Sequence, residues 1–142
     1  MTVQRIIEGR EFSVVTCESD VTVKDAIALL AEKRIGALPV MEGGKVVGIF
    51  SERDVVYQLA DSGAEVLSTP VCDVMTSPAV TVTPDVSALA AISLMSKRRI
   101  RHLPVIENDT MVGFVSIGDL VKYRIDKIES EADALRSYIR TA

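Results

Sequence analysis

The sequence GIFSERD occupies residues 48–54, and GFVSIGD occupies residues 113–119. Gly, Ser and Asp recur in these two stretches at a constant offset of 65 residues. Aligned without a gap at that offset, residues 15–56 and 80–121 are identical at 18 of 42 positions. Because the identities fall where turns and buried strands need particular residues, they indicate an internal duplication rather than a chance similarity.

Each copy is predicted to run strand, helix, strand, strand, helix. The first helix of each copy is expected to begin after a capping residue, Thr22 in one copy and Ser87 in the other. The predicted strands are 14–16, 37–41 and 46–50 in the first copy, and 79–82, 102–106 and 111–115 in the second. A copy of about 50 residues has little interior of its own, so the two copies should pack together about a pseudo-twofold axis.

These patterns predict an α+β fold of two βαββα repeats. The repeats are placed at residues 14–62 and 79–122. An N-terminal lead-in at 1–13 precedes the first repeat, and a linker with a second lead-in occupies 63–78. The two lead-ins match at an offset of 68, which indicates a short insertion before the first repeat.

The second repeat continues into an apolar heptad pattern, so one long helix is expected from about Ile117 to about Arg140. The apolar positions step by four and three residues through Val121, Ile125, Ile128, Ala132, Leu135 and Ile139. This stripe could fold back on its own repeat or cover a second chain. Because it is narrow and continues beyond the repeat, through the extension at 123–142, it favours a partner helix in a homodimer.

Composition excludes several classes of function. The chain of 142 residues is 48% hydrophobic, and its apolar runs have the length of strands, so no membrane span is expected. The frequent charges in residues 1–12 predict no secretory signal and a cytoplasmic location. A net charge of −4 argues against sequence-independent nucleic-acid binding.

The reactive side chains are few. Cys17 and Cys72 match no metal-ligand spacing and are expected to be reduced, buried thiols. His102 is the single histidine, which argues against a metal site and against a catalytic base. With no nucleophile–base pair and no Walker-type loop, we expect no catalytic residue, no metal and no catalytic cofactor.

The repeated Ser-x-x-Asp turn has two compatible interpretations. In the first, Ser51 and Asp54 only cap a helix, since a hydroxyl and an acidic side chain satisfy free N–H groups there. In the second, the same carboxylate accepts the two hydroxyls of a ribose beside the helix start. Gly48 and Gly113 favour a close approach at this place, because Gly otherwise weakens a strand.

With these turns, the hydrophobic-Pro strands and the sequence DVMTSP at 73–78, the chain resembles a tandem pair of cystathionine β-synthase (CBS) domains, the Bateman module, of the stand-alone bacterial type. The resemblance covers roughly residues 14–122. It implies a non-catalytic regulatory module that binds an adenine nucleotide, AMP, ATP or NAD(H), in two clefts between the repeats and senses energy or redox state. The residues do not decide among these ligands.

The resemblance also implies roles for particular residues. The ribose-binding residues would be Ser51 and Asp54 in one cleft and Ser116 and Asp119 in the other. The phosphate-binding residues would be Arg53, Arg101 and His102. The wall of the Asp54 cleft would include Val74, Met75, Ser77, Pro78 and Ile100, and that of the Asp119 cleft Ile35, Gly36, Ala37 and the lead-in from Ile7 to Ser13.

The two expected clefts differ in charge. Arg101–His102 aligns with Gly36–Ala37, and Arg53 aligns with Gly118. We therefore expect the Asp54 cleft to take the more anionic end of a nucleotide. The alternative function, of a different class, is a ligand-independent dimerisation scaffold. In either case the regulated protein would be an unidentified partner acting in trans.

Overall fold

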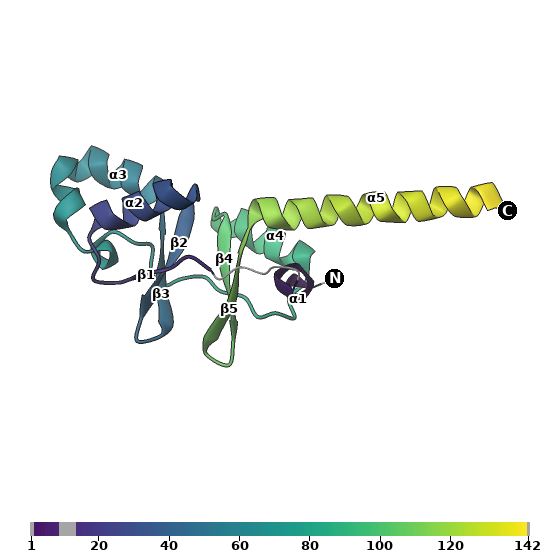
Figure 1. The fold of residues 1–142 in the computed structure, drawn as a ribbon, viewed down its shortest axis with the longest axis horizontal. Coiled ribbons are helices and arrows are strands. Elements are labelled where there is room, and N and C mark those ends of the chain that lie inside the picture. Colours follow the sequence, from purple (N-terminus) through teal and green to yellow (C-terminus); the bar gives the residue numbers. More distant parts are fainter. Residues whose placement is uncertain (1, 9–13, 142) are drawn as a thin grey trace.

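The computed structural model describes residues 2–8 and 14–141, and Figure 1 shows them as two adjacent units with one long helix projecting from the second. The helices and strands are α1 (Val3–Glu8), β1 (Cys17–Glu18), α2 (Val23–Lys33), β2 (Ala37–Glu42), β3 (Lys45–Ser51), α3 (Glu52–Ser62), η1 (Gly63–Ser68), η2 (Val71–Asp73), α4 (Ala88–Arg98), β4 (His102–Glu107), β5 (Thr110–Ser116) and α5 (Ile117–Thr141). The predicted α+β fold of two repeats is confirmed.

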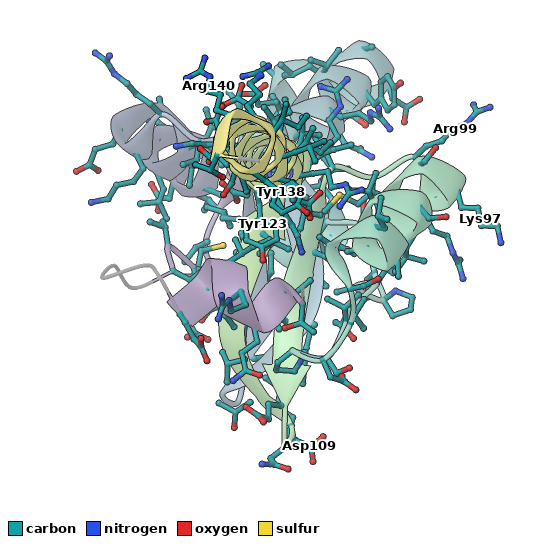
Figure 2. The ribbon with its side chains drawn as sticks, turned by 90° about the vertical axis from the view of Figure 1, so that its right-hand side faces the viewer. Lys97, Arg99, Asp109, Tyr123, Tyr138 and Arg140 are labelled. Carbon is teal, nitrogen blue, oxygen red and sulfur yellow. The ribbon has the colours of Figure 1, made fainter. Side chains whose placement is uncertain are left out.

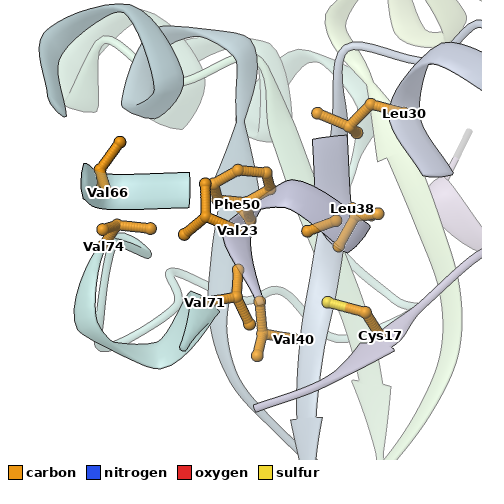
Figure 3. Packing of buried hydrophobic residues seen from close by; sticks show 10 residues of the cluster. Cys17, Val23, Leu30, Leu38, Val40, Phe50, Val66, Val71 and Val74 are labelled. Atoms are coloured by element: carbon orange, nitrogen blue, oxygen red, sulfur yellow. The ribbon is translucent and has the colours of Figure 1, made fainter. Parts of the chain in front are cut away.

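The first repeat is a three-stranded sheet in the order β1-β2-β3, with β1 parallel and β3 antiparallel to β2. Its α2 begins where predicted, because Thr22 Oγ1 accepts a hydrogen bond from Asp25 N at 3.2 Å. The helix packs its apolar face on the sheet around Phe50 and Leu38, both fully buried (Figure 3). Burial of this apolar surface is the main source of the repeat's stability.

The second repeat reproduces the pairing of the first with one loss. β4 and β5 pair in the same register as β2 and β3, including the bulge after Val105 that matches the bulge after Val40. The strands predicted at 14–16 and 79–82 are wrong in extent: β1 starts at Cys17, and its counterpart is the single bridge between Val82 and Val105.

Proline explains the lost strand. Ser19 N donates to Met41 O at 3.0 Å and so continues the pairing of β1. The position 65 residues later is Pro84, which has no N–H to donate. Pairing in the second repeat therefore ends at Val82, where two hydrogen bonds to β4 remain.

Each lead-in packs on the repeat that does not follow it. Val71, ahead of the second repeat, is fully buried in the first core, and its N–H donates to Val21 O at 2.7 Å. Val3, ahead of the first repeat, is fully buried in the second core and donates to Val86 O at 2.8 Å. The offset of 68 between the lead-ins is thus confirmed by equivalent hydrogen bonds, and the two repeats are joined by an exchange of segments.

The lead-ins also account for the two strand glycines. A Cβ on Gly48 would lie 2.5 Å from Met75 Sδ and 2.8 Å from Thr76 O, and one on Gly113 would lie 2.6 Å from Ile7 Cγ2. The close approach expected at these glycines is therefore made by protein, which leaves the adjoining Ser-x-x-Asp turns to meet any ligand.

The long C-terminal helix is confirmed, since α5 runs from Ile117 to Thr141. Within residues 2–8 and 14–141 there is no helix with the length and apolar character to cross a membrane. Both cysteines are free, but only Cys17 is buried; Cys72 is exposed, so the prediction of a buried thiol there is wrong. Burial, with the nearby Glu18, raises the pKa of Cys17 to about 11.

Candidate functional site

The Ser51-x-x-Asp54 turn forms a complete capping box at the start of α3. Ser51 N donates to Asp54 Oδ2 at 2.9 Å, and Asp54 N donates to Ser51 Oγ at 3.4 Å. Asp119 and Ser116 make the same two bonds at the start of α5, at 2.8 and 3.0 Å. The structural role of both turns is therefore present, and it fixes the position of each carboxylate.

Asp54 has a further partner, Thr76, which was not among the residues predicted for the site. Thr76 Oγ1 donates to Asp54 Oδ1 at 3.2 Å, and Ser51 Oγ donates to Oδ2 at 3.2 Å. A carboxylate offers about four acceptor positions. A diol that uses both hydroxyls would therefore take the remaining position and replace the threonine.

A cleft of about 400 Å³ opens beside Asp54 and is lined by both repeats. Clefts of this size accommodate small organic ligands. The lining residues are Gly36, Ile49, Ser51, Glu52, Arg53, Asp54, Thr76, Pro78, Ala79, Val80, Arg99, Ile100, Arg101 and His102. The structure thus brings the predicted residues Ser51, Arg53, Asp54, Pro78, Ile100, Arg101 and His102 to one cavity.

Arginines dominate the charge of this cleft. Arg53, Arg99 and Arg101 line it together with the two carboxylates of Glu52 and Asp54. Arg53 crosses between the repeats, with Nη1 donating to Arg99 O at 3.3 Å. Arg99 was not predicted as a site residue, although it belongs to the basic segment KRRIRH, because its left-handed φ of 55° at the end of α4 could not be seen in the sequence.

His102 lies between the two Ser-x-x-Asp turns. It lines the Asp54 cleft, pairs with Ser116 in the β4–β5 register and stacks on Phe114 with ring centroids 5.4 Å apart. Burial lowers the pKa of His102, an effect that Arg101 reinforces and that the charges of Asp119 and Glu52 oppose. At pH 7 the imidazole is therefore neutral and can donate a hydrogen bond. A phosphate-binding residue is more favourable as a cation, so His102 offers a phosphate less than Arg101 does.

Three of the lead-in residues predicted to line the Asp54 cleft are structural instead. Val74 is buried in the first core, Met75 packs over Gly48, and Ser77 Oγ donates to Val47 O at 2.9 Å. They differ from Thr76 and Pro78, which line the cleft, because their own contacts are with the first core and with β3. A sequence motif identifies such a segment but not which of its side chains point outward.

The residues predicted for the Asp119 cleft are only partly placed together. Gly36 lines the Asp54 cleft, where a Cβ on it would lie 3.6 Å from Glu52 Oε1. Ala37 is buried opposite Ser51 in the β2–β3 pairing, and Ile35 packs on the first core. Ile7 packs over Gly113, and the expected contacts at 9–13 fall outside the described residues. Among the described residues, no cluster of His, Cys, Asp and Glu could hold a metal ion.

Comparison with known proteins agrees with this architecture. The family model described as "CBS domain" matches residues 10–61 and 71–126. The CBS domain-containing protein CBSX3, mitochondrial, of Arabidopsis thaliana is 39% identical over 129 residues. That match covers 87% of this chain and 63% of the plant protein, so this chain spans less than two thirds of that relative.

Solved structures share most of this fold. The CBS-domain containing protein ATU1752 from Agrobacterium tumefaciens has a TM-score of 0.83 and 36% identity, over 87% of this chain and 99% of that one. The CBS domain pair of protein MJ0100, solved with 5′-methylthioadenosine and S-adenosyl-L-methionine, has a TM-score of 0.77 and 25% identity, over 89% and 98% of the two chains. Because the family match covers both repeats and these structures share their arrangement, the chain belongs to the CBS domain family.

Proposed function

We propose that this chain is a non-catalytic regulatory module that binds an adenine nucleotide in the Asp54 cleft. The observation that carries the proposal is one cavity lined both by a ribose-compatible carboxylate from the first repeat and by arginines from the second. Asp54 would accept the ribose hydroxyls, and Arg101 would meet phosphate. AMP, ATP and NAD(H) all present both groups, and the structure of MJ0100 with two adenosine compounds supports the adenosine part.

Ligand binding at the boundary between the repeats suggests how a signal would form. Arg53 already joins α3 of the first repeat to Arg99 at the end of α4 in the second. A phosphate held by arginines of both repeats would favour one relative position of the repeats over others. The regulated protein would read that position in trans, and nucleotide level would set it, as expected of a sensor of energy or redox state.

The Asp119 turn is proposed as a weaker or differently specific site. Its register equivalents of Arg53 and Arg101 are Gly118 and Gly36, which carry no charge. At the lead-in offset of 68, Glu8 stands where Thr76 stands in the Asp54 cleft. A carboxylate there would oppose an anionic ligand. We therefore expect one phosphate-dependent site in each chain.

Calorimetric titration of nucleotide-free protein with AMP, ADP, ATP, NAD(H) and S-adenosylmethionine tests the proposal. At least one nucleotide should bind, and at 100 times its Kd it should add about 2.7 kcal/mol of stability, a rise of several degrees in Tm. Arg101→Ala should weaken nucleotide binding about tenfold or more, since it removes a charge-assisted contact. Adenosine, without phosphate, should bind both proteins equally.

Two matched variants separate binding from folding. Arg98→Ala removes an exposed cation at the end of α4, three residues before Arg101 and outside the cleft, and should bind as wild type does. Asp119→Asn weakens the cap equivalent to the one that Asp54→Asn weakens, so both should lose about 1 kcal/mol of stability, but only Asp54→Asn should lose affinity at the phosphate-dependent site. Equal nucleotide affinity in wild type, Arg101→Ala and Asp54→Asn would show that the assignment is wrong.

The second candidate function is a ligand-independent scaffold that dimerises. The complete capping boxes favour it, because both Ser-x-x-Asp turns already have a structural role. If no nucleotide gives a heat of binding in the calorimetric titration, the scaffold function is favoured. A homodimer is expected under either function, and the cytoplasmic location stays a prediction from the sequence.

A further inference from the structure

The outer part of α5 presents an apolar stripe that its own chain leaves exposed. Leu120, near the start of the helix, is buried against the second core, but the helix then extends away from both repeats (Figure 1). The exposed fractions of the stripe are Val121 41%, Ile125 49%, Ile128 50%, Leu135 59% and Ile139 65%. The first turns of α5 contact α4 and α1, and Figure 2 looks along the helix from its outer end.

A helix in this position needs a partner. An isolated helical segment of about 15 residues is only marginally stable in water, and exposed leucine and isoleucine side chains at heptad spacing favour association. Folding back on its own repeat, the alternative left open by the sequence, does not occur, because α5 is one unbroken helix to Thr141. The stripe must therefore be covered by another molecule.

We propose that the occupant is α5 of a second copy of this chain, aligned in parallel and in register as a two-stranded coiled coil. In this arrangement Ile125, Ala132 and Ile139 occupy a positions, and Val121, Ile128 and Leu135 occupy d positions. Each core residue then meets its own counterpart across the twofold axis. The inference does not depend on the proposed nucleotide site.

Charge complementarity selects the parallel arrangement. In a parallel coiled coil, a residue at g faces the residue at the next e position of the partner. Arg124 at g then faces Glu129 of the second copy, and Glu131 at g faces Arg136. Because the dimer is symmetric, each of these ion pairs occurs twice. Arg136 also forms an ion pair with Asp133 in its own chain at 3.0 Å. Because both side chains are about 70% exposed, that pair is weak and does not prevent Arg136 from pairing with Glu131 of the second copy.

Antiparallel pairing is unfavourable because it brings these charged residues next to like charges. With full overlap of the stripes, Glu129 faces Glu129, Glu131 faces Glu131, and Lys122 faces Arg136. All three contacts join like charges, which is unfavourable. Shifting the helices by one heptad in either direction relieves the repulsion but leaves one end of the stripe, either Val121 and Ile125 or Leu135 and Ile139, beyond the partner's stripe.

Disulfide trapping of the full-length, nucleotide-free chain tests the orientation. Cys72 is exposed, so Cys72→Ser supplies the background, while Cys17 remains buried. Ala132→Cys should give a covalent dimer on mild oxidation, because an a position faces itself only in the parallel, in-register pair. Ser130→Cys, at the outer f position of the same turn, is the matched control and should stay uncrosslinked. No dimer from Ala132→Cys, or equal yields from both, would overturn the proposal.

Charge reversal supplies a second test in sedimentation equilibrium. Glu129→Arg should raise the dimer Kd about tenfold, because it turns two attractive contacts into two repulsive ones. Adding Arg124→Glu should restore the affinity of wild type, since the swapped pair is again opposite in charge. In the antiparallel pairs shifted by one heptad the double variant would stay weak, and in the fully overlapping pair Glu129→Arg would change little, because residue 129 faces itself there. A double variant as weak as the single one, or a wild-type chain that is monomeric across the micromolar range, contradicts the inference.

Discussion

His102 responds to the charges of both Ser-x-x-Asp turns. It lines the Asp54 cleft while pairing with Ser116, and Asp119 and Glu52 raise its pKa. Burial is the larger effect and, together with Arg101, leaves the pKa below its ordinary value. The imidazole is therefore kept neutral beside a cation, an arrangement that favours donation of one hydrogen bond over attraction of an anion.

The depressed pKa of His102 predicts how stability changes with pH. A group whose pKa is lower in the folded chain contributes stability above its unfolded pKa and loses it as pH falls through the folded pKa. The Tm of wild type should therefore fall further between pH 7 and pH 5.5 than the Tm of His102→Gln, in which this titration is absent. Thermal melts of the two proteins at both pH values measure the difference, and parallel losses would contradict it.

At the scale of single residues, the sequence predicted the capping pairs and the cationic cleft, but not every contact within the cleft. The Ser51–Asp54 bond is local, so the spacing of three residues was enough to predict it. The bond from Thr76 to Asp54 spans 22 residues and depends on how the lead-in lies against β3. Its register equivalent is Glu8, so the duplication gave no signal for it.

At the scale of elements, both repeat helices end in a strained residue. Arg34 after α2 and Arg99 after α4 adopt left-handed φ values of 54° and 55°, which favour glycine. The strain is the same in the two repeats, but only Arg99 lines the Asp54 cleft. The side chain of Arg99 therefore has a place in the cleft that the side chain of Arg34 lacks.

The pair of helix ends allows stability to be separated from binding. Arg34→Gly and Arg99→Gly should each raise stability by about 0.5–1 kcal/mol, because glycine adopts this conformation without strain. Only Arg99→Gly should weaken nucleotide binding, by a factor of about ten. Chemical denaturation and titration of both variants measure the two effects. A loss of affinity in Arg34→Gly as large as that in Arg99→Gly would contradict this assignment.

At the scale of the whole molecule, the exchange of lead-ins makes one structure from two repeats. The sequence predicted that the repeats need each other and that the lead-ins correspond, since both follow from periodic patterns. It did not show that Val3 completes the second core, because hydrophobic pattern alone carries no information about which distant segment fills a space. The resemblance placed the lead-ins near the clefts, and the structure adds that they are also parts of the two cores.

This exchange predicts that damage to either lead-in weakens the whole chain. Val3→Ala and Val71→Ala each remove two buried methyl groups from fully buried positions, so each should cost about 2 kcal/mol of stability. Because each lead-in joins one repeat to the core of the other, calorimetry should show a single transition in both variants, lowered by about 6 °C. Val56→Ala, at a position that is 61% exposed, is the control and should melt close to wild type. If Val3→Ala instead splits the melt into two transitions, the repeats fold independently and the exchanged lead-ins do not couple them.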